Sequence, residues 1–77
     1  MNWDDIRIFL ALDRGRSFKA AARQLGVHAS TVSRRLEGFE GTTGIPLFDR
    51  TPDGLLPTLA ADRIRPRALE AEEAMLA

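Results

Sequence analysis

Side chains that can bind phosphates and base edges are concentrated in one stretch of this 77-residue sequence. Residues 14–36 contain no aspartate or glutamate, although the whole chain has 11 basic and 11 acidic residues and a formal net charge of zero. Within the stretch, hydroxyl groups stand beside a guanidinium at Ser30, Thr31, Ser33 and Arg34, and such groups bind phosphate oxygens and base edges. The distribution of charge, rather than its sum, favours a nucleic acid as the partner. The alternative is an ordinary solvated helical surface. The basic residues of the stretch are Arg14, Arg16, Lys19, Arg23, Arg34 and Arg35.

Other kinds of chemistry find little support. The chain has no cysteine and one histidine, His28, so thiolate metal sites and histidine clusters are excluded. No histidine base stands near a serine in a recognisable motif, and there is no glycine-rich phosphate loop. We therefore expect no enzymatic activity, no cofactor and no metal. The N-terminus lacks a signal-peptide pattern and no apolar run is long enough to span a membrane, which predicts a soluble, cytoplasmic protein without a membrane partner.

Two short helices joined by a glycine would position the basic stretch. Ser17 is a good N-cap, and apolar residues follow it at helical spacing up to Leu25. Gly26 turns the chain, and the next helix is expected over about residues 29–43. Its core side carries Ala29, Val32, Leu36 and Phe39, so Ser30 and Arg34 point the opposite way. This pattern predicts a helix-turn-helix whose second helix can read a DNA groove.

The residues before this motif predict one more helix. It should begin after Asn2, an N-cap, with Asp4 and Asp5 in the first turn where they complement the helix dipole. Ile6, Phe9 and Leu10 share one face. We expect Gly15 to end the helix in a left-handed conformation.

A short β-hairpin is expected after the motif. Residues 45–50 and 55–58 flank Thr51-Pro52-Asp53-Gly54, whose residue types favour a turn. Pro46 and Pro57 lack backbone donors, so the strands should be short edge strands. We expect Leu47, Phe48 and either Leu55 or Leu56 to pack onto the helices.

A final helix should begin after the N-cap Thr58 and be kinked at Pro66. Small and apolar residues recur along it at spacings of three and four, which predicts a short coiled-coil seam and hence a dimer interface. The alternative is that the same face packs on its own domain. The predicted interface residues are Ala61, Ile64, Ala68, Ala71 and Met75.

The expected fold class is mainly α: a winged helix-turn-helix over residues 1–58, with three helices and the hairpin as the wing, followed by a linker or dimerisation helix over 59–77. This order resembles the N-terminal DNA-binding domain of LysR-type transcriptional regulators. The resemblance covers essentially the whole chain and implies a homodimer, with a larger effector-binding domain in the full regulator outside these 77 residues. Its carriers are NWDDIRIFLA at 2–11, SFKAAARQLGV at 17–27, STVSRRL at 30–36 and GIPLFDRTPDG at 44–54.

By this resemblance, residues 29, 30, 31, 33 and 34 would lie nearest the DNA and Arg50 of the wing would meet a phosphate. Arg34 is our first choice for base reading, because a guanidinium can contact O6 and N7 of guanine together. Ser17 and Lys19 suit phosphate contacts at the start of the preceding helix. The predicted DNA-contacting residues are Ser17, Lys19, Ala29, Ser30, Thr31, Ser33, Arg34 and Arg50.

Some positions depart from the family pattern. His28 replaces the usual serine or threonine N-cap and is interpreted as a makeshift cap. Ala29 stands where glutamine often reads bases, so it can offer only apolar contact to a thymine methyl. Asp53 at the wing tip would repel phosphate and argues against insertion into the minor groove.

The function that we infer from the sequence is sequence-specific binding of double-stranded DNA by a dimer, with the helix at about 29–43 in the major groove. The alternative from another class is a winged-helix module for protein interaction or dimerisation without specific DNA binding.

Overall fold

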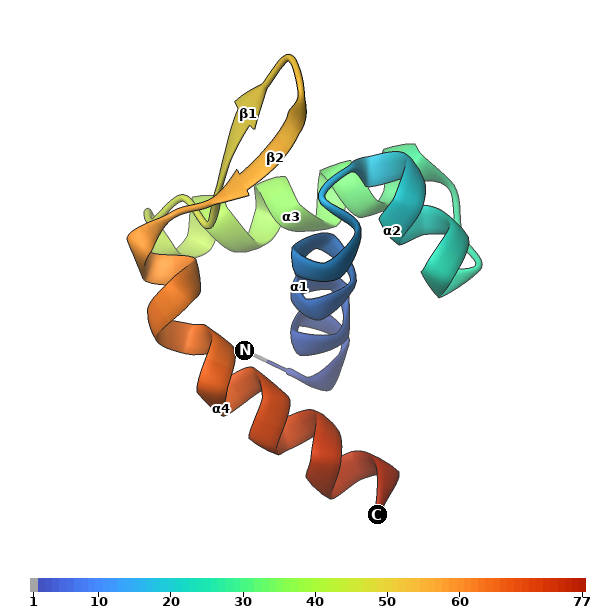
Figure 1. Cartoon of the computed structure of the whole chain (residues 1–77), viewed down its shortest axis with the longest axis vertical. Helices are drawn as coiled ribbons and strands as arrows, with labels where there is room; N and C mark the ends of the chain where they lie inside the picture. The colour runs from blue at the N-terminus through green and yellow to red at the C-terminus, as the bar shows by residue number, and fades with distance from the viewer. Residues whose placement is uncertain (1) are drawn as a thin grey trace.

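Four helices and one hairpin make up the computed structural model, which describes residues 2–77 (Figure 1). Three helices come first, then the two strands, then the long final helix. None of the helices between residues 2 and 77 combines the length and the apolar character needed to cross a membrane. The elements are α1 (Trp3–Gly15), α2 (Phe18–Leu25), α3 (Ala29–Thr43), β1 (Phe48–Thr51), β2 (Gly54–Pro57) and α4 (Leu59–Leu76).

Helix α1 lies at the centre of the core and contacts α2, α3 and α4. The predicted face is present, with Phe9 and Leu10 buried and Ile6 packed at the edge. Burial extends further around the helix than predicted, to Ile8, Ala11 and Leu12, because other helices cover α1 on several sides. The Phe9 ring also reaches the wing, where its centroid lies 5.7 Å from that of Phe48.

The predicted N-caps of three helices are confirmed. At α1, the Asp5 amide donates to Asn2 Oδ1 at 2.9 Å, and the Asn2 amide donates to Asp5 Oδ2 at 3.2 Å, which completes a capping box. Ser17 and Thr58 accept in the same way from the amides of residues 20 and 61. His28 is the N-cap residue of α3, but its side chain makes no capping hydrogen bond, so the makeshift cap predicted for it is wrong.

The end of α1 differs from our prediction. Gly15 is the last helical residue, and the left-handed residue is Arg16, at φ 58°. Gly15 is needed for close approach instead, because a Cβ there would lie 2.9 Å from Ala20 Cβ. The Arg16 side chain supports the unusual conformation by donating from Nε to the Asp13 carbonyl at 2.6 Å.

The wing is a two-stranded antiparallel hairpin around Pro52 and Asp53, with Thr51 paired to Gly54. This confirms the predicted turn, although β1 begins only at Phe48. The inward-facing wing residues are Leu47, Phe48 and Leu55, whereas Leu56 is exposed.

One backbone contact fastens the wing to the connection between α1 and α2. The Leu55 amide donates to the Arg16 carbonyl at 2.8 Å. Gly54 lies directly over the same carbonyl, with φ 124°, and a Cβ on Gly54 would lie 2.7 Å from the oxygen. The position of the wing therefore depends on a glycine at residue 54.

Replacing Gly54 by alanine should lower the free energy of unfolding by about 1 to 3 kcal/mol, because the methyl group strains the backbone and pushes against the Arg16 carbonyl. Chemical denaturation measures the change. Gly38→Ala is the matched control: it adds the same methyl group in open space on α3, where alanine should stabilise the helix by about 0.5 to 1 kcal/mol. Equal stability of the two variants would contradict the tight contact.

Helix α4 packs on its own domain through part of the predicted dimer seam. Ala61 is fully buried and Ala68 is 4% exposed. The dimer interface predicted at these two alanines is therefore wrong for this conformation, and the alternative of packing on their own domain holds for them. Ile64 and Ala71 are half-buried and Met75 is exposed. The helix continues through Pro66 without a break.

Two ion pairs hold α4 against the C-terminal end of α1. Arg65 donates to the two carboxylate oxygens of Asp13 at 2.8 and 2.9 Å. Arg14 donates to both carboxylate oxygens of Glu72 at 2.8 and 2.6 Å. Both pairs have the two-bond geometry that fixes a guanidinium against a carboxylate.

The Asp13 pair predicts a pH dependence of stability. Hydrogen bonds from Arg65 hold the pKa of Asp13 below its ordinary value of 3.8. Because this pKa is lower in the folded state, its contribution is complete above about pH 4 and is lost as the pH falls through the folded pKa. Asp13→Asn should remove this part of the acid sensitivity and cost about 1 to 3 kcal/mol at neutral pH. Denaturation curves between pH 7 and pH 2 test this, and identical acid sensitivity of the two proteins would contradict it.

Candidate nucleic-acid interface

The exposed face of α3 carries the polar residues predicted for it. Ser30 and Arg34 are exposed, and Thr31 and Ser33 are partly exposed. The opposite face is in the core, where Val32 and Leu36 are buried and Ala29 and Phe39 pack at the edge. The half-buried position of Ala29 leaves only part of its methyl group for a ligand.

Helix α2 crosses α3 closely because its inner face is made of alanines. Ala21 and Ala22 are buried, and Gly26 adopts the left-handed conformation that ends the helix, at φ 71°. The predicted helix-turn-helix is thereby confirmed as geometry. Ser17 and Lys19 lie in the first turn of α2, where the Ser17 hydroxyl accepts from the Ala20 amide at 3.0 Å and Lys19 is exposed.

The basic stretch is partly neutralised in space by acids that are distant in the sequence. Arg14 pairs with Glu72 at 2.6 Å, and Arg35 pairs with Asp4 at 3.0 Å. Arg16 lies 3.7 Å from Asp13. These three cations are therefore paired with acids of α1 and α4.

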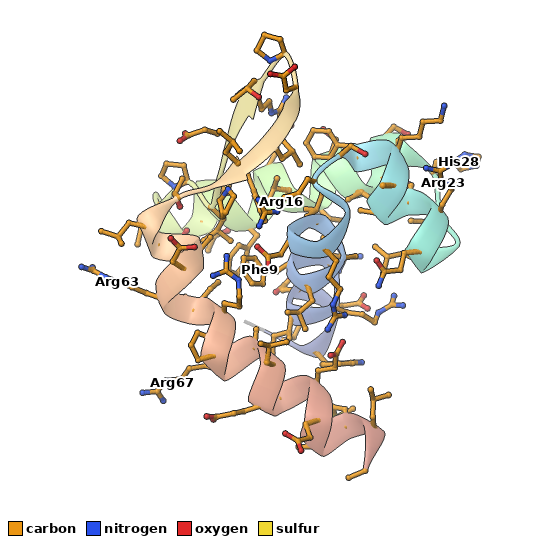
Figure 2. All side chains as sticks on the ribbon, in the orientation of Figure 1. Phe9, Arg16, Arg23, His28, Arg63 and Arg67 are labelled. Carbon is orange, nitrogen blue, oxygen red and sulfur yellow. The ribbon has the colours of Figure 1, made fainter. Side chains whose placement is uncertain are left out.

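The other three basic residues of the stretch, Lys19, Arg23 and Arg34, make no ion pair with any acid among residues 2–77. All three are exposed and lie on the two helices of the motif. Arg23, in the last turn of α2, and His28, which precedes α3, both extend outward at the same end of the motif (Figure 2). Fewer cations are therefore free than the six basic residues of the stretch indicated, and the free ones lie on the helix-turn-helix.

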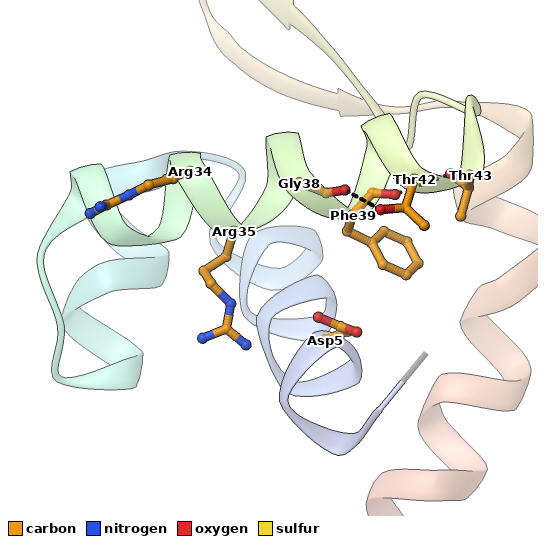
Figure 3. A pocket seen from close by; sticks show the side chains of 7 residues that line it. All are labelled: Asp5, Arg34, Arg35, Gly38, Phe39, Thr42 and Thr43. Carbon is orange, nitrogen blue, oxygen red and sulfur yellow. Dashed lines mark hydrogen bonds between the residues drawn. The ribbon is translucent and has the colours of Figure 1, made fainter.

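The two neighbouring arginines of α3 point in different directions. Arg35 reaches towards α1, whereas Arg34 extends along α3 towards the turn that precedes it (Figure 3). Both line an open hollow of about 430 Å³ between α3 and the start of α1. Its other lining residues are Asp5, Gly38, Phe39, Thr42 and Thr43.

Arg50 joins the wing to both helices of the motif. Its guanidinium carbon lies 5.0 Å from the centroid of the Phe18 ring, next to Ser17. Its Nη2 atom also lies 3.4 Å from a carboxylate oxygen of Glu37 on α3. Sequence reasoning did not include Glu37, although its spacing from Ser33 and Arg34 places it on the exposed side of α3.

The hairpin beside a three-helix core and the free cations on the motif define a winged helix-turn-helix domain. Residues 3–62 match the family described as bacterial regulatory helix-turn-helix protein, lysR family. The chain belongs to that family, which confirms the resemblance and the fold class inferred from the sequence. The family consists of transcriptional regulators and is not a family of enzymes.

Relatives and solved structures agree with this assignment. The Mau operon transcriptional activator of Paracoccus denitrificans is 43% identical over 58 residues, which cover 75% of this chain and 20% of the relative. The probable transcriptional regulator PA0477 of Pseudomonas aeruginosa superposes with a TM-score of 0.90 at 27% identity, covering 97% of this chain and 25% of that one. The BenM DNA-binding domain in complex with catB site 1 DNA gives 0.90 at 24% identity, covering 97% and 84%. The chain spans about a fifth of the length of its first curated relatives.

Proposed function

We propose that this chain binds double-stranded DNA sequence-specifically, as the DNA-binding part of a bacterial transcriptional regulator, with α3 in the major groove. The observation that carries the proposal is the placement of Lys19, Arg23 and Arg34, which are exposed and unpaired within residues 2–77 on the two helices of the motif. Free cations beside exposed hydroxyl groups are what phosphates and base edges require. The similar BenM domain was crystallised with DNA, which supports the same kind of ligand here.

Different residues would serve different parts of the duplex. Arg34 is assigned to base reading, since its guanidinium is free and can contact guanine through two hydrogen bonds. Ser30, Thr31 and Ser33 would contact phosphates or bases with little discrimination, and the half-buried Ala29 would at most touch a thymine methyl. The contacts assigned to the phosphate backbone are those of Ser17, Lys19 and Arg50.

We further propose that residues 1–58 contact the DNA and that residues 59–77 form a linker and dimerisation helix. Because Ala61 and Ala68 are buried, the proposed interface uses the remaining predicted residues, Ile64, Ala71 and Met75, together with the exposed Leu69 and Leu76. A regulator of this kind would carry its effector-binding domain outside these 77 residues and would act on the chromosome, in the cytoplasm.

Charge along α4 favours an antiparallel pair of these helices. Arg63 and Arg67 extend away from the domain (Figure 2), whereas Glu70 and Glu73 are exposed in the following turns. None of the four makes an ion pair within residues 2–77. A two-fold axis near Ala68 would place the arginines of one copy against the glutamates of the other, as a self-complementary interface requires.

A charge-swap series tests this pairing by sedimentation over a range of protein concentrations. Arg63→Glu with Arg67→Glu should weaken dimerisation about tenfold or more, because like charges then face each other. Adding Glu70→Arg and Glu73→Arg should restore it. A four-substitution variant that associates no better than the two-substitution variant contradicts the antiparallel pairing.

Selection of bound sequences from a random duplex pool tests the proposed function. We expect enrichment of a motif with two related half-sites, about one or more helical turns apart, because a two-fold dimer places two recognition helices in successive grooves. Recovery of unenriched sequences contradicts specific DNA binding and favours a module for protein interaction.

A further inference from the structure

Glu37 places a carboxylate on the face of α3 that the proposed function turns towards DNA. At about 100° per residue, Glu37 falls between Ser30 and Ser33 when α3 is viewed along its axis. Its side chain is 62% exposed. Glu40, the other acid of α3, is turned to the wing connection, where its carboxylate accepts from the amides of Leu47 and Phe48. Both acids of α3 therefore lie near its serines around the helix axis, but only the carboxylate of Glu37 is left free of backbone amides.

The partner of this carboxylate is the arginine that the wing brings to the same surface. Arg50 donates from Nη2 to Glu37 Oε1 at 3.4 Å, and its side chain is 56% exposed. The Phe18 ring, 5.0 Å from the guanidinium carbon, supports the arginine from the side of α2. Arg50 is thus held at the meeting point of α2, α3 and the wing.

A long and exposed ion pair is weak and can be replaced by a stronger anionic partner. Such pairs contribute about 0.2 to 1 kcal/mol, whereas a duplex carries a negative charge about every 1.7 Å along its axis. The phosphates would repel the Glu37 carboxylate. The same carboxylate also pairs with Arg50, the cation that could otherwise bind a phosphate.

We propose that Glu37 is a positioning residue that holds Arg50 in competition with DNA phosphate and so limits sequence-independent binding. This inference rests on the proposed function. In the free protein the paired Arg50 and Glu37 carry no net charge together. When Arg50 exchanges Glu37 for a phosphate, the loss of the pair offsets part of the gain, on any DNA sequence.

Affinity for a duplex of arbitrary sequence, measured over a range of salt concentrations, tests the competition. Glu37→Gln should tighten binding about two- to fivefold. It should also steepen the slope of log affinity against log salt by up to about 0.9, because Arg50, which the parent chain divides between Glu37 and phosphate, then neutralises one phosphate in full. In the Arg50→Met background the same substitution should change the slope much less, because it removes only the direct repulsion between the carboxylate and the phosphates. A purely structural role for Glu37 would not move the slope, and thermal melting checks that each variant is folded.

Asp49→Asn is the matched control. It removes the same charge from the residue next to Arg50, but strand alternation turns Asp49 to the other side of β1, where it is exposed. We expect its slope to equal that of the parent chain.

The outcomes separate this inference from the proposed function. If the parent chain binds no duplex at any salt concentration, the proposed function itself is wrong. If it binds with a salt-dependent affinity but Glu37→Gln has the parent slope, or changes the slope equally with and without Arg50, only the competition is overturned.

Discussion

Replacing Leu36 by alanine is expected to lower the free energy of unfolding by about 2 to 5 kcal/mol. Leu36 is 3% exposed and belongs to the buried core that α1 and α3 share, so removal of its side chain leaves a cavity. A 77-residue domain buries a small core, and this loss is a large part of its total stability.

Chemical denaturation followed by circular dichroism measures the Leu36→Ala effect. Leu56→Ala is the matched control, because this leucine is 54% exposed on the wing and its truncation should change stability by only about 0.5 kcal/mol. A Leu36→Ala protein that unfolds at the parent midpoint would contradict the core as described.

Replacing Arg34 by alanine is expected to weaken binding to the preferred duplex by about 1 to 3 kcal/mol without changing the fold. The side chain is exposed and makes no ion pair within residues 2–77, so nothing in the described structure depends on it. Discrimination at one base position should be relaxed at the same time, since the guanidinium is assigned to a guanine. Binding titrations with the preferred duplex and with single-base variants measure both effects.

Two further variants distinguish base reading from general charge. Arg35→Ala removes the neighbouring guanidinium, which is occupied by Asp4, and should weaken binding much less. Lys19→Ala should lower affinity for all duplexes similarly and reduce the salt slope by about 1. Equal losses for Arg34→Ala and Arg35→Ala would contradict the assignment of Arg34 to base reading.

Local features of the fold were predictable from the sequence because their causes are local. Asn2, Ser17 and Thr58 cap the helices that follow them, as their residue types indicate. Apolar spacing likewise placed Val32 and Leu36 on the inner face of α3. These features depend on neighbours within one helical turn.

Features that depend on distant neighbours were not predictable in the same way. Gly15 has the residue type that favours a left-handed cap. The structure instead requires a glycine there because α2 approaches closely, and the residue with the left-handed conformation is Arg16. Ala61 and Ala68 have coiled-coil spacing, yet α4 uses them against its own domain. The same spacing suits packing on a second copy of the helix and packing on the chain's own domain, so spacing alone does not distinguish the two.

In the candidate site, too, local features were predictable and long-range pairings were not. The motif, its exposed hydroxyl groups and Arg34 follow from periodicity. The pairing of Arg14 with Glu72 and of Arg35 with Asp4 joins residues 58 and 31 positions apart, and only the tertiary structure reveals which cations remain free.

Affinity for duplex DNA as a function of salt concentration tests the central claim most directly. If the free cations Lys19 and Arg23 each neutralise a phosphate while Arg34 reads a base, log affinity should fall linearly with log salt at a slope of about −1.8 or steeper for each copy of the domain. A salt-independent affinity, or no binding to duplex DNA at low salt, would contradict the claim that the free cations of α2 and α3 form a DNA-binding surface.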